Sequence, residues 1–562
     1  MYDVAIIGGG LAGLTLAAQL QQDNPDLSIA VLERSSLPPP VAAHKVGEST
    51  VEIGAHYLAD TLGLEELLER TQLRKFGLRL FFGSGAQKDL AAADELGASR
   101  LLPAKSYQID RGRLEADLAD MLKERGVTIV DDCVVRDIEL SANGAGHEVT
   151  ASVSQAPRKL RCRWLVDGTS RAALVKRRLG ISRSSGHKIS SAWFRLDKAI
   201  AVDDWSPSQD WQDRCDRPRL YSTNHLMGSG YWVWIIPLVD DRTSIGLVAD
   251  PEIHPFSSYG NFEKFSAWLT RHQPTLGEEV AAAADTLMDF RFCKNLSQDT
   301  EQFWSTQRWA LTGEAGAFAD PFYSPGSDFI GINNTFVADL VRRERKGEDW
   351  ALRATLYERM YRSFYESTMS LYEKQYAGFG DTRLMVVKTT WDYAYYWSVL
   401  SWLFFRKVLT DLDFLLVAQP RLVAMRALND RMQAAFRQRA AEGIVDEGSG
   451  RFVDQTAIPI FYELNGALLE TPADISQELT GNCERLEALG GRAVGDVLGV
   501  VVVLGLLHLA EVGAVEQFLE AHDLRTLRGR LACGLLVLDD HRLLVAGPVG
   551  LQECGGDDVG HD

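Results

Sequence analysis

The chain has 562 residues, of which 46% are hydrophobic and 24% are charged, a balance typical of folded globular proteins. At about 150 residues per domain, this length predicts three or four packed units. The formal net charge is −18, so nucleic acid is a poor partner, because most of the surface would repel a polyanion.

The cysteines and the apolar segments exclude further classes of protein. Seven cysteines stand singly, without CxxC pairs, so neither a disulfide framework nor a bound metal is expected, and a reducing cytoplasm fits best. The chain opens directly as a strand, without the pattern of a signal peptide. Two apolar runs, Tyr393 to Phe405 and Val497 to Ala510, are shorter than the ~20 residues that span a bilayer and predict buried helices.

Residues 2 to 33 predict a strand, a glycine turn, a helix and a second strand. Gly8, Gly10 and Gly13 have the GxGxxG spacing between the first strand and the helix. The glycines allow a tight turn, a close approach of backbone to a pyrophosphate, and close helix packing. Glu33 ends the second strand, where a carboxylate can bind a ribose hydroxyl. This unit therefore predicts dinucleotide binding and leaves FAD and NAD open.

Later segments extend the predicted parallel sheet. Arg111 heads an amphipathic helix that leads into a strand at Val127 to Val130. Two more predicted strands are each followed by a turn that contains glycine. Leu160 to Val166 precedes Asp167-Gly168, and Trp309 to Thr312 precedes Gly313-Glu314. The predicted class is thus α/β, with a Rossmann-like nucleotide-binding core.

The remaining chain is expected to form three further regions. Residues 185 to 300 alternate in the manner of an inserted antiparallel sheet, within a core of residues 1 to 345. A helical region follows over 346 to 455, and a helical module with a frayed polar tail covers 456 to 562. Because the region after 345 is rich in tyrosine and tryptophan, we expect it to pack on the core and close the substrate channel.

The order of these motifs resembles that of single-FAD monooxygenase-type flavoproteins, which favours FAD. The resemblance implies cofactor contacts from Arg111 and Asp167, and from Asp320, after which the chain passes the isoalloxazine. It also implies that a helix with Gly331, starting near Asn333, aims its N-terminus at the flavin. The family commonly has aspartate where this chain has Glu314, so a ribityl contact there has a changed reach.

The resemblance narrows to the flavin-dependent halogenases, the group that includes tryptophan, pyrrole and phenol halogenases. Residues 232 to 237 match the group's WxWxIP signature, in which Trp232 and Trp234 fill space beside the flavin. Glu48 and Ser49 lie in a segment similar to the group's GEST element next to the cofactor. The group commonly continues with proline, whereas this chain has Val51-Glu52.

Lys75-Phe76-Gly77 follows Glu48 and resembles the element that supplies the group's catalytic lysine. An ammonium in a dry tunnel can hydrogen-bond hypohalous acid, or the amine can form a haloamine, and either route delivers an electrophile. Without the flanking motifs Lys75 would be read as a solvated charge. Arg74 and Arg79 are expected to help depress its pKa.

The run from Phe322 to Gly331 predicts a halide site. Backbone N–H groups of a turn at Pro325, Gly326 and Ser327 can form a concave anion site, although the same letters also suit a plain Pro-Gly turn. The run is most similar to the loop of the chloramphenicol-type halogenases. It lacks an obvious counterpart of the glutamate that tryptophan halogenases use, so free tryptophan is a less expected substrate.

Two other features carry competing interpretations. In some relatives an aspartate esterifies the flavin, and Asp289 lies in a plausible region, but a solvated or capping aspartate is the commoner case. The charged run from 342 to 346 predicts a solvated helix end, with docking of an acidic carrier protein as the alternative.

The resemblance implies an enzyme of secondary metabolism, including antibiotic biosynthesis. A separate reductase supplies FADH2, O2 forms a flavin hydroperoxide, chloride or bromide attacks it, and Lys75 guides hypohalous acid to an aromatic or acyl substrate, free or on a carrier protein. Two alternatives remain open. A flavin monooxygenase that hydroxylates a phenol or peptide would share the FAD motifs, and a non-catalytic flavin-binding protein would keep only residues 8 to 33.

Overall fold

The computed structural model describes residues 1–39, 45–141, 145–445 and 447–497, together with three strands between 535 and 553. Residues 1–500 and 501–562 form two separate units. Within the described residues, no helix is both long and apolar enough to cross a membrane.

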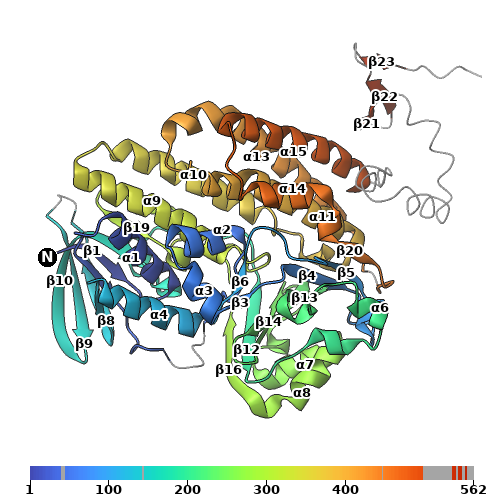
Figure 1. The fold of residues 1–562 in the computed structure, drawn as a ribbon, viewed down its shortest axis with the longest axis horizontal. Helices are drawn as coiled ribbons and strands as arrows, with labels where there is room; N and C mark the ends of the chain where they lie inside the picture. Colours follow the sequence, from blue (N-terminus) through green and yellow to red (C-terminus); the bar gives the residue numbers. More distant parts are fainter. Residues whose placement is uncertain are drawn as a thin grey trace, which may run out of the picture. The chain divides into compact units, whose positions relative to one another are not determined.

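The first sheet of the larger unit has a Rossmann-like parallel core, which confirms the predicted α/β class (Figure 1). Its strand order is β18-β19-β10-β1-β2-β7, and the hairpin β8–β9 adds to β10. Helix α1 packs against α4 and α9, so the glycine turn leads directly into a buried helix. The elements are β1 (Tyr2–Ile7), α1 (Leu11–Asp23), β2 (Ile29–Leu32), α4 (Arg111–Glu124), β7 (Thr128–Val130), β8 (Cys133–Glu139), β9 (His147–Val153), β10 (Ala156–Asp167), β18 (Trp304–Ser305), β19 (Trp309–Leu311) and α9 (Gly326–Lys346).

The second sheet has the strand order β16-β12-β15-β14-β13-β4-β5-β20. Helices α7 (Phe262–His272) and α8 (Pro274–Ala282) contribute to its hydrophobic core. The strands are β4 (Leu78–Phe82), β5 (Asp94–Gly97), β12 (Ser190–Leu196), β13 (Thr223–Gly228), β14 (Tyr231–Leu238), β15 (Arg242–Ala249), β16 (Leu287–Cys293) and β20 (Phe452–Asp454).

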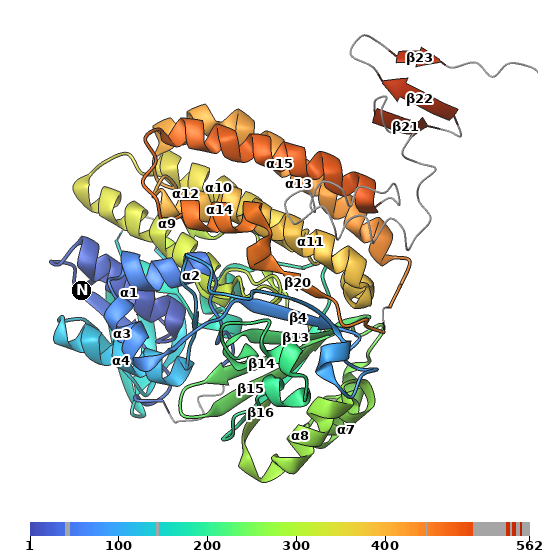
Figure 2. The same cartoon turned by 45° about the vertical axis from the view of Figure 1, so that its right-hand side comes forward.

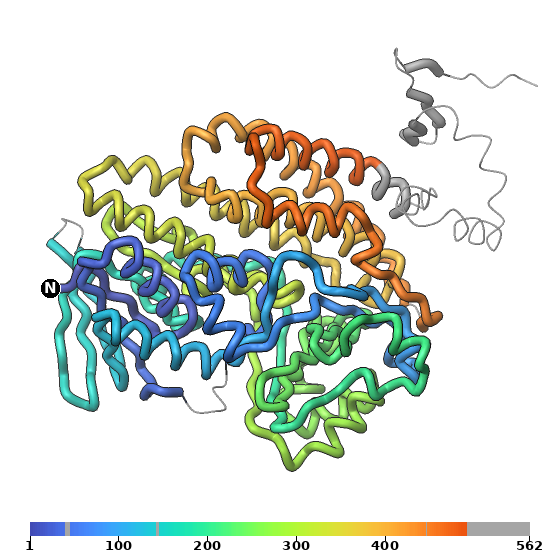
Figure 3. Tube along the Cα trace, viewed as in Figure 1, coloured from blue at the N-terminus to red at the C-terminus, as the bar shows by residue number. Residues whose placement is uncertain are grey.

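This sheet differs from the predicted antiparallel insertion. Strands β4 and β5 precede the insertion in sequence, and β20 comes far after it. In Figure 3 these strands are blue and orange, beside the green strands of the insertion. Two of the joins, β13 with β4 and β20 with β5, are parallel. The added strands have five, four and three residues, which is too short for an alternating pattern to identify them.

The helical region after residue 345 packs on both sheets rather than forming an appendage, as its aromatic content predicts (Figure 2). The apolar run from Tyr393 to Phe405 forms the end of α11, the turn η10 and α12, and is largely buried. The elements are α10 (Ala351–Met369), α11 (Thr382–Tyr395), η10 (Tyr396–Ser401), α12 (Trp402–Phe405), α13 (Leu412–Ala440), α14 (Pro459–Ala467) and α15 (Ile475–Val497).

The expectation of a wholly helical C-terminal module is wrong. After α15, the smaller unit contains an antiparallel sheet of three strands, which are β21 (Leu535–Asp539), β22 (Arg542–Ala546) and β23 (Leu551–Glu553). Beyond Val497, the second predicted buried helix lies outside the described residues, and so does the polar tail from 554.

One carboxylate, that of Asp94, joins the segment before β20 to the second sheet. Asp94, at the start of β5, is 2% exposed and accepts hydrogen bonds from the backbone N–H groups of Ser449 and Arg451, at 3.0 and 3.1 Å. The Arg451 guanidinium donates to it at 2.6 Å. Burial alone would raise the pKa of Asp94, but these hydrogen bonds outweigh burial and lower it to about 2.

We predict that Asp94→Asn loosens this join. A buried acceptor of charged hydrogen bonds contributes roughly 1–3 kcal/mol, so the melting temperature should fall and proteases should cut more readily between 441 and 450. In the wild type the contribution is present above pH 4 and is lost as the pH falls toward 2, because protonation removes the charge. The exposed Glu470→Gln serves as the control, and equal melting of both variants would contradict the assignment.

Candidate active site

The glycine turn forms a cradle that leaves no room for side chains at two positions. Gly8 has φ of +106°, and a Cβ there would lie 2.4 Å from the carbonyl oxygen of Gly168. A Cβ on Gly13 would lie 2.0 Å from the carbonyl oxygen of Gly8. At Gly10 a Cβ would meet only Glu115, at 3.9 Å, so that glycine leaves open space at the helix N-terminus. These positions fit a bound dinucleotide.

The N-terminus of α1 already holds a negative charge. The carboxylate of Glu115 on α4 accepts a hydrogen bond of 3.0 Å from the Leu11 backbone N–H. Arg111 donates to the same carboxylate at 2.6 Å, and Lys45 forms an ion pair with it. The arrangement shows that this helix end favours an anion, with two cations beside it. Glu115 was not predicted, since it is an unremarkable helical glutamate in sequence.

Glu33 lies next to the glycine turn, as its position in the motif predicts. Its carboxylate accepts hydrogen bonds of 2.7 Å from the Gly9 N–H and 3.0 Å from the Ser35 N–H. Asp167 is fully buried and accepts from the backbone N–H groups of Thr169 and Val175, so it shapes the loop after β10.

Two further predicted cofactor residues, Glu314 and Asp320, lie between β19 and α9, whereas Gly331 and Asn333 lie inside α9. Glu314 accepts a hydrogen bond of 2.6 Å from Ser170, and Asp320 is buried and bonded to His187 and Tyr376, both at 2.7 Å. The helix expected to start near Asn333 begins instead at Gly326. Asn333 is therefore buried two turns inside α9 and offers no N-terminal N–H group.

The tryptophan pair connects the second sheet to the loop before α9. Trp232 and Trp234 are buried on β14, with ring centroids 5.7 Å apart. The indole of Trp232 packs on Phe322, at 5.3 Å between centroids, and donates a hydrogen bond of 3.0 Å to Tyr376. Phe322, in turn, begins the predicted halide run, so the two motifs are in contact.

The segment with Glu48 and Ser49 is held by a buried ion-pair cluster. Arg195 on β12 bonds the Glu48 carboxylate at 2.7 Å and the Asp289 carboxylate at 2.6 Å. Asp289 is 6% exposed, so the interpretation of a solvated or capping aspartate is wrong.

The charged run at the end of α9 is paired in part, because Arg342 and Arg343 form ion pairs with Asp339.

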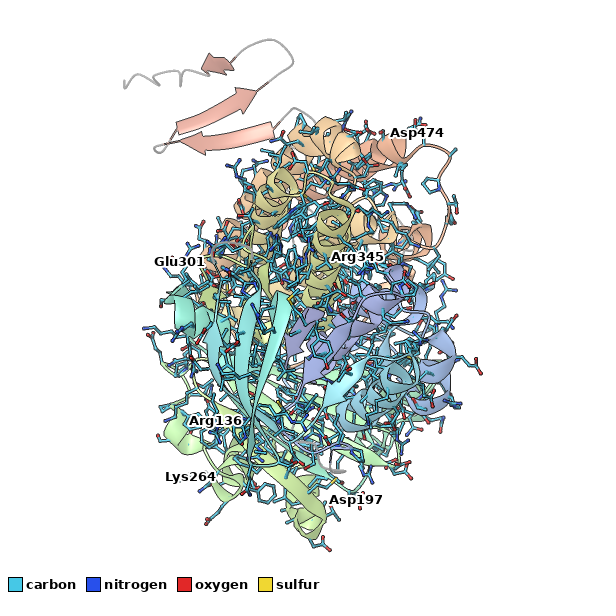
Figure 4. All side chains as sticks on the ribbon, turned by 90° about the vertical axis from the view of Figure 1, so that its left-hand side faces the viewer. Arg136, Asp197, Lys264, Glu301, Arg345 and Asp474 are labelled. Carbon is cyan, nitrogen blue, oxygen red and sulfur yellow. The ribbon has the colours of Figure 1, made fainter. Side chains whose placement is uncertain are left out.

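Lys75 lies between the short strand β3 (Leu73–Arg74) and β4 of the second sheet, and it is only 2% exposed. Its Nζ donates to the Ser49 hydroxyl and to the Thr50 carbonyl, both at 2.8 Å. By contrast, the charged side chains labelled in Figure 4, such as Arg136, Lys264 and Asp474, are exposed at the periphery. Burial disfavours the ammonium and lowers the pKa of Lys75 to about 7.

Two carboxyl groups that were not predicted act on this lysine. The charge of Glu52, and that of Asp328 when it is ionised, counteract the effect of burial on the pKa of Lys75, whereas Arg74 and Arg79 do not depress it as expected. Arg79 instead forms a buried ion pair with Glu95. Glu52 stands where the halogenase group commonly has proline, and this departure was the available signal for it.

Asp328 is fixed by both of its oxygens. It accepts hydrogen bonds of 2.7 Å from the Gly54 N–H and 2.6 Å from the Tyr396 hydroxyl. Burial raises the pKa of Asp328 to about 8, so this carboxyl is mostly protonated at neutral pH. Tyr396 belongs to the helical region, which therefore takes part in the site.

The predicted halide run forms the start of α9 rather than a free turn. Gly326 and Ser327 are the first helical residues, and their N–H groups have no intrahelical partner. Before them, Tyr323 and Ser324 have φ of 68° and 60°, a costly conformation for non-glycine residues. The Ser327 hydroxyl is buried and has no hydrogen-bond partner among the described residues. The N-terminus of α9 therefore suits a small anion.

A cavity of about 450 Å³ begins at this cluster and extends into the helical region. Its inner end is lined by Lys75, Glu52, Pro325 and Asp328. Tyrosines of the loop before α9 and of the helical region surround it, and they are Tyr323, Tyr372, Tyr393, Tyr395 and Tyr396. The cavity thus brings the predicted lysine and the predicted halide run to one space.

Comparison with known families agrees with this geometry. The model of the tryptophan halogenase family matches residues 86–377, and a model of NAD(P)-binding Rossmann-like domains matches residues 6–70. The first match covers more than half of the chain.

Curated relatives carry halogenase names. The flavin-dependent halogenase chlA of Dictyostelium discoideum is 26% identical over 436 residues, which are 71% of this chain and 70% of the relative. A 1H-pyrrole-2-carbonyl peptidyl-carrier-protein chlorinase of Pseudomonas fluorescens is 24% identical over 64% of this chain and 80% of its own. The sulochrin halogenase gedL of Aspergillus terreus is 22% identical over 61% of this chain and 64% of its own.

Solved structures share the fold. The halogenase PltM has a TM-score of 0.65 at 16% identity, covering 91% of this chain and 99% of its own. The flavin-dependent halogenase CmlS has a TM-score of 0.54 at 19% identity, covering 97% of this chain and 85% of its own.

We predict that Gly10→Ala separates cofactor binding from folding. Because a Cβ at this position meets only Glu115 at 3.9 Å, the variant should melt like the wild type without FAD. The methyl group would, however, keep the pyrophosphate from the backbone, so we expect FAD to bind at least tenfold more weakly and to raise the melting temperature less. Gly481→Ala, a helical glycine with open space around it, is the matched control. Unchanged FAD affinity in Gly10→Ala would contradict the cradle.

Proposed function

This chain belongs to the tryptophan halogenase family, whose members are flavin-dependent enzymes, and we propose that Lys75 delivers the halogen to an electron-rich aromatic or activated acyl substrate. The observation that supports this most directly is the burial of Lys75 at the inner end of a cavity that also reaches the first turn of α9. A monooxygenase of the same fold would need neither the buried lysine nor an anion site there.

The glycine cradle, Glu33 and Arg111 would hold FAD. When bound, FAD reduced by a separate reductase and reoxidised by O2 supplies the oxidant that turns halide into hypohalous acid. The N–H groups of Gly326 and Ser327 would bind chloride or bromide at the positive end of α9. Asp328, protonated at neutral pH, adds no negative charge that would repel the halide.

We propose the haloamine route for Lys75. With a pKa of about 7, a large share of Lys75 is the free amine at neutral pH, whereas an ordinary lysine is almost wholly protonated. The amine nitrogen attacks the halogen of hypohalous acid, an N–halogen bond forms, and hydroxide leaves with the displaced N–H proton as water. The ring carbon of the substrate then takes the halogen, and the ring proton restores the N–H bond of Lys75.

The curated relatives support two forms of substrate. One is named for a pyrrole-2-carbonyl group on a peptidyl carrier protein, and another is named for sulochrin. The tyrosine-lined inner end of the cavity supports an aromatic group beside Lys75, since aromatic rings pack well on one another. Both carrier-bound and free aromatic substrates therefore remain within the proposal.

We predict that Lys75→Ala keeps FAD binding but abolishes halogenated product. Lys75→Arg should fail as well, because a guanidinium stays protonated and cannot form the N–halogen bond. Product formation is measured by mass spectrometry with reductase, NADH, FAD and bromide on candidate aromatic substrates. Lys45→Ala, which removes a cation paired with Glu115, is the control and should affect FAD affinity rather than halogen transfer. Near-native product from Lys75→Ala would overturn the assignment.

We predict that Glu52→Gln moves the pH dependence of halogenation. Product formation by the wild type should rise with pH around 7, because the amine of Lys75 replaces the ammonium there. Removing the charge of Glu52 takes away a partner that favours the ammonium, so the rise should move to lower pH. Glu66→Gln, at an exposed position on the neighbouring α3 (Glu65–Thr71), should leave the profile in place. A uniform loss of rate without a shift would mean that Glu52 has only a structural role.

A further inference from the structure

The cavity is much longer than the site around Lys75 requires. Residues that line it recur at every third or fourth position of α10, from Leu356 to Thr368, and of α13, from Leu412 to Arg426. At ~1.5 Å per residue these stripes run for about 18 and 21 Å. These faces of the two helices therefore line a long part of the cavity, and the helices also touch, since Arg426 on α13 donates a hydrogen bond of 2.7 Å to the Ser363 carbonyl on α10.

The chemistry of the lining changes along this length. Lys75 and carboxyl groups gather at the inner end, where Glu52, Asp328 and Asp392 line the space with that lysine. The walls farther out carry the apolar side chains of Leu356, Met360, Phe364, Leu412, Leu415 and Leu422, and Arg359, Gln419 and Arg426 line them as well. A ligand that matches this gradient has a polar head at the inner end and a hydrocarbon part between the helices.

The outer end reaches the surface. Leu416 and Val423 line the cavity on α13, yet they are 63% and 59% exposed, whereas Lys75 and Asp392 are 2% and 3% exposed. Leu416 and Val423 are seven residues apart, two turns of one helix face. They mark an apolar mouth, and large exposed aliphatic side chains in such a place are typical of a binding surface.

The volume also exceeds the need of one ring. A closed apolar cavity of about 150 Å³ is enough to bind benzene. The cavity here has about 450 Å³, so a single-ring substrate beside Lys75 would leave most of the apolar space unfilled. Apolar walls that stay in contact with water are unfavourable, and a hydrocarbon chain that covered them would remove this apolar surface from water.

We propose that the substrate is an electron-rich aromatic compound, of the phenol or resorcinol type, that carries a long unbranched hydrocarbon chain. The ring lies beside Lys75, and the chain runs between α10 and α13 to the mouth at Leu416 and Val423. The identification of the ring with the reacting group rests on the function proposed above. The site for the chain rests on the cavity alone.

The first test measures binding without turnover. Resorcinols with unbranched 5-alkyl chains of increasing length are titrated, below their aggregation concentrations, into the full-length protein loaded with oxidised FAD, by calorimetry. The affinity should rise roughly fourfold for each methylene group that becomes buried, and should level off once the chain reaches the mouth. Affinity that is independent of chain length, or that rises without levelling off, would overturn the proposal.

The second test uses exposed positions, where folding is not at risk. Leu416→Asp and Val423→Asp place a charge at the mouth and should weaken binding of the longest resorcinol at least tenfold, without affecting the methyl compound. Val417→Asp is the matched control, because Val417 is 67% exposed on the same helix but does not line the cavity. An equal effect of all three variants would contradict a chain site at the mouth.

The two proposals fail in different ways. In one outcome, binding depends on chain length but no halogenated product forms, although the reductase delivers reduced FAD. This result would support the site for the chain and contradict the proposed function. Halogenation of short resorcinols, with no increase in affinity for longer chains, would support the proposed function and contradict the site for the chain.

Discussion

Lys75 is a cation held almost entirely out of water, and a buried ammonium must either lose its proton or find carboxylate partners. In this protein both happen in part, because burial lowers its pKa to about 7 while Glu52 and Asp328 oppose that effect. Its two hydrogen bonds to Ser49 and Thr50 fix the nitrogen to the segment beside the cofactor cradle. The site depends on keeping water away from this one nitrogen.

The helical region provides much of that enclosure. Tyr396 donates to Asp328, and Asn465 on α14 donates to Glu52 at 3.1 Å, so residues far along the chain hold the carboxyl groups that act on Lys75. The family match ends at residue 377, yet α11, η10 and α13 form much of the cavity wall. The first turn of α9 thus lies within the matched segment, Lys75 lies before it, and much of the cavity wall comes from residues after it.

A strained loop connects these parts. Tyr323 and Ser324 both have positive φ, and such residues persist only where their surroundings hold them. The Tyr323 hydroxyl donates to Asp392 at 3.1 Å, and Asp392 also accepts from the buried Lys388 at 2.8 Å. This ion pair of the helical region therefore helps to keep the start of α9 in place, and with it the N–H groups that suit an anion.

The amino-acid sequence alone determined the nucleotide-binding unit, because local rules decide it. The glycine spacing, the alternation of strand and helix and the place of Glu33 are encoded within about 30 residues, and the structure has these elements there. The alternating pattern of residues 185 to 300 is local in the same way, and β12 (Ser190–Leu196) and β14 (Tyr231–Leu238) lie within it. A family resemblance, rather than any physical pattern, singled out Lys75 among many lysines.

Only the tertiary structure decided the rest. Strand β20 has three residues and becomes a strand by pairing with β5, which no local pattern announces. The sequence Pro325-Gly326 is typical of a turn, yet Gly326 is the first residue of α9, and Ser327 lies against Gly54. Glu115 at the end of α1, and Glu52 and Asp328 around Lys75, come from distant parts of the chain. The fold brings these acidic groups beside basic ones and out of water, where electrostatic interactions are strong.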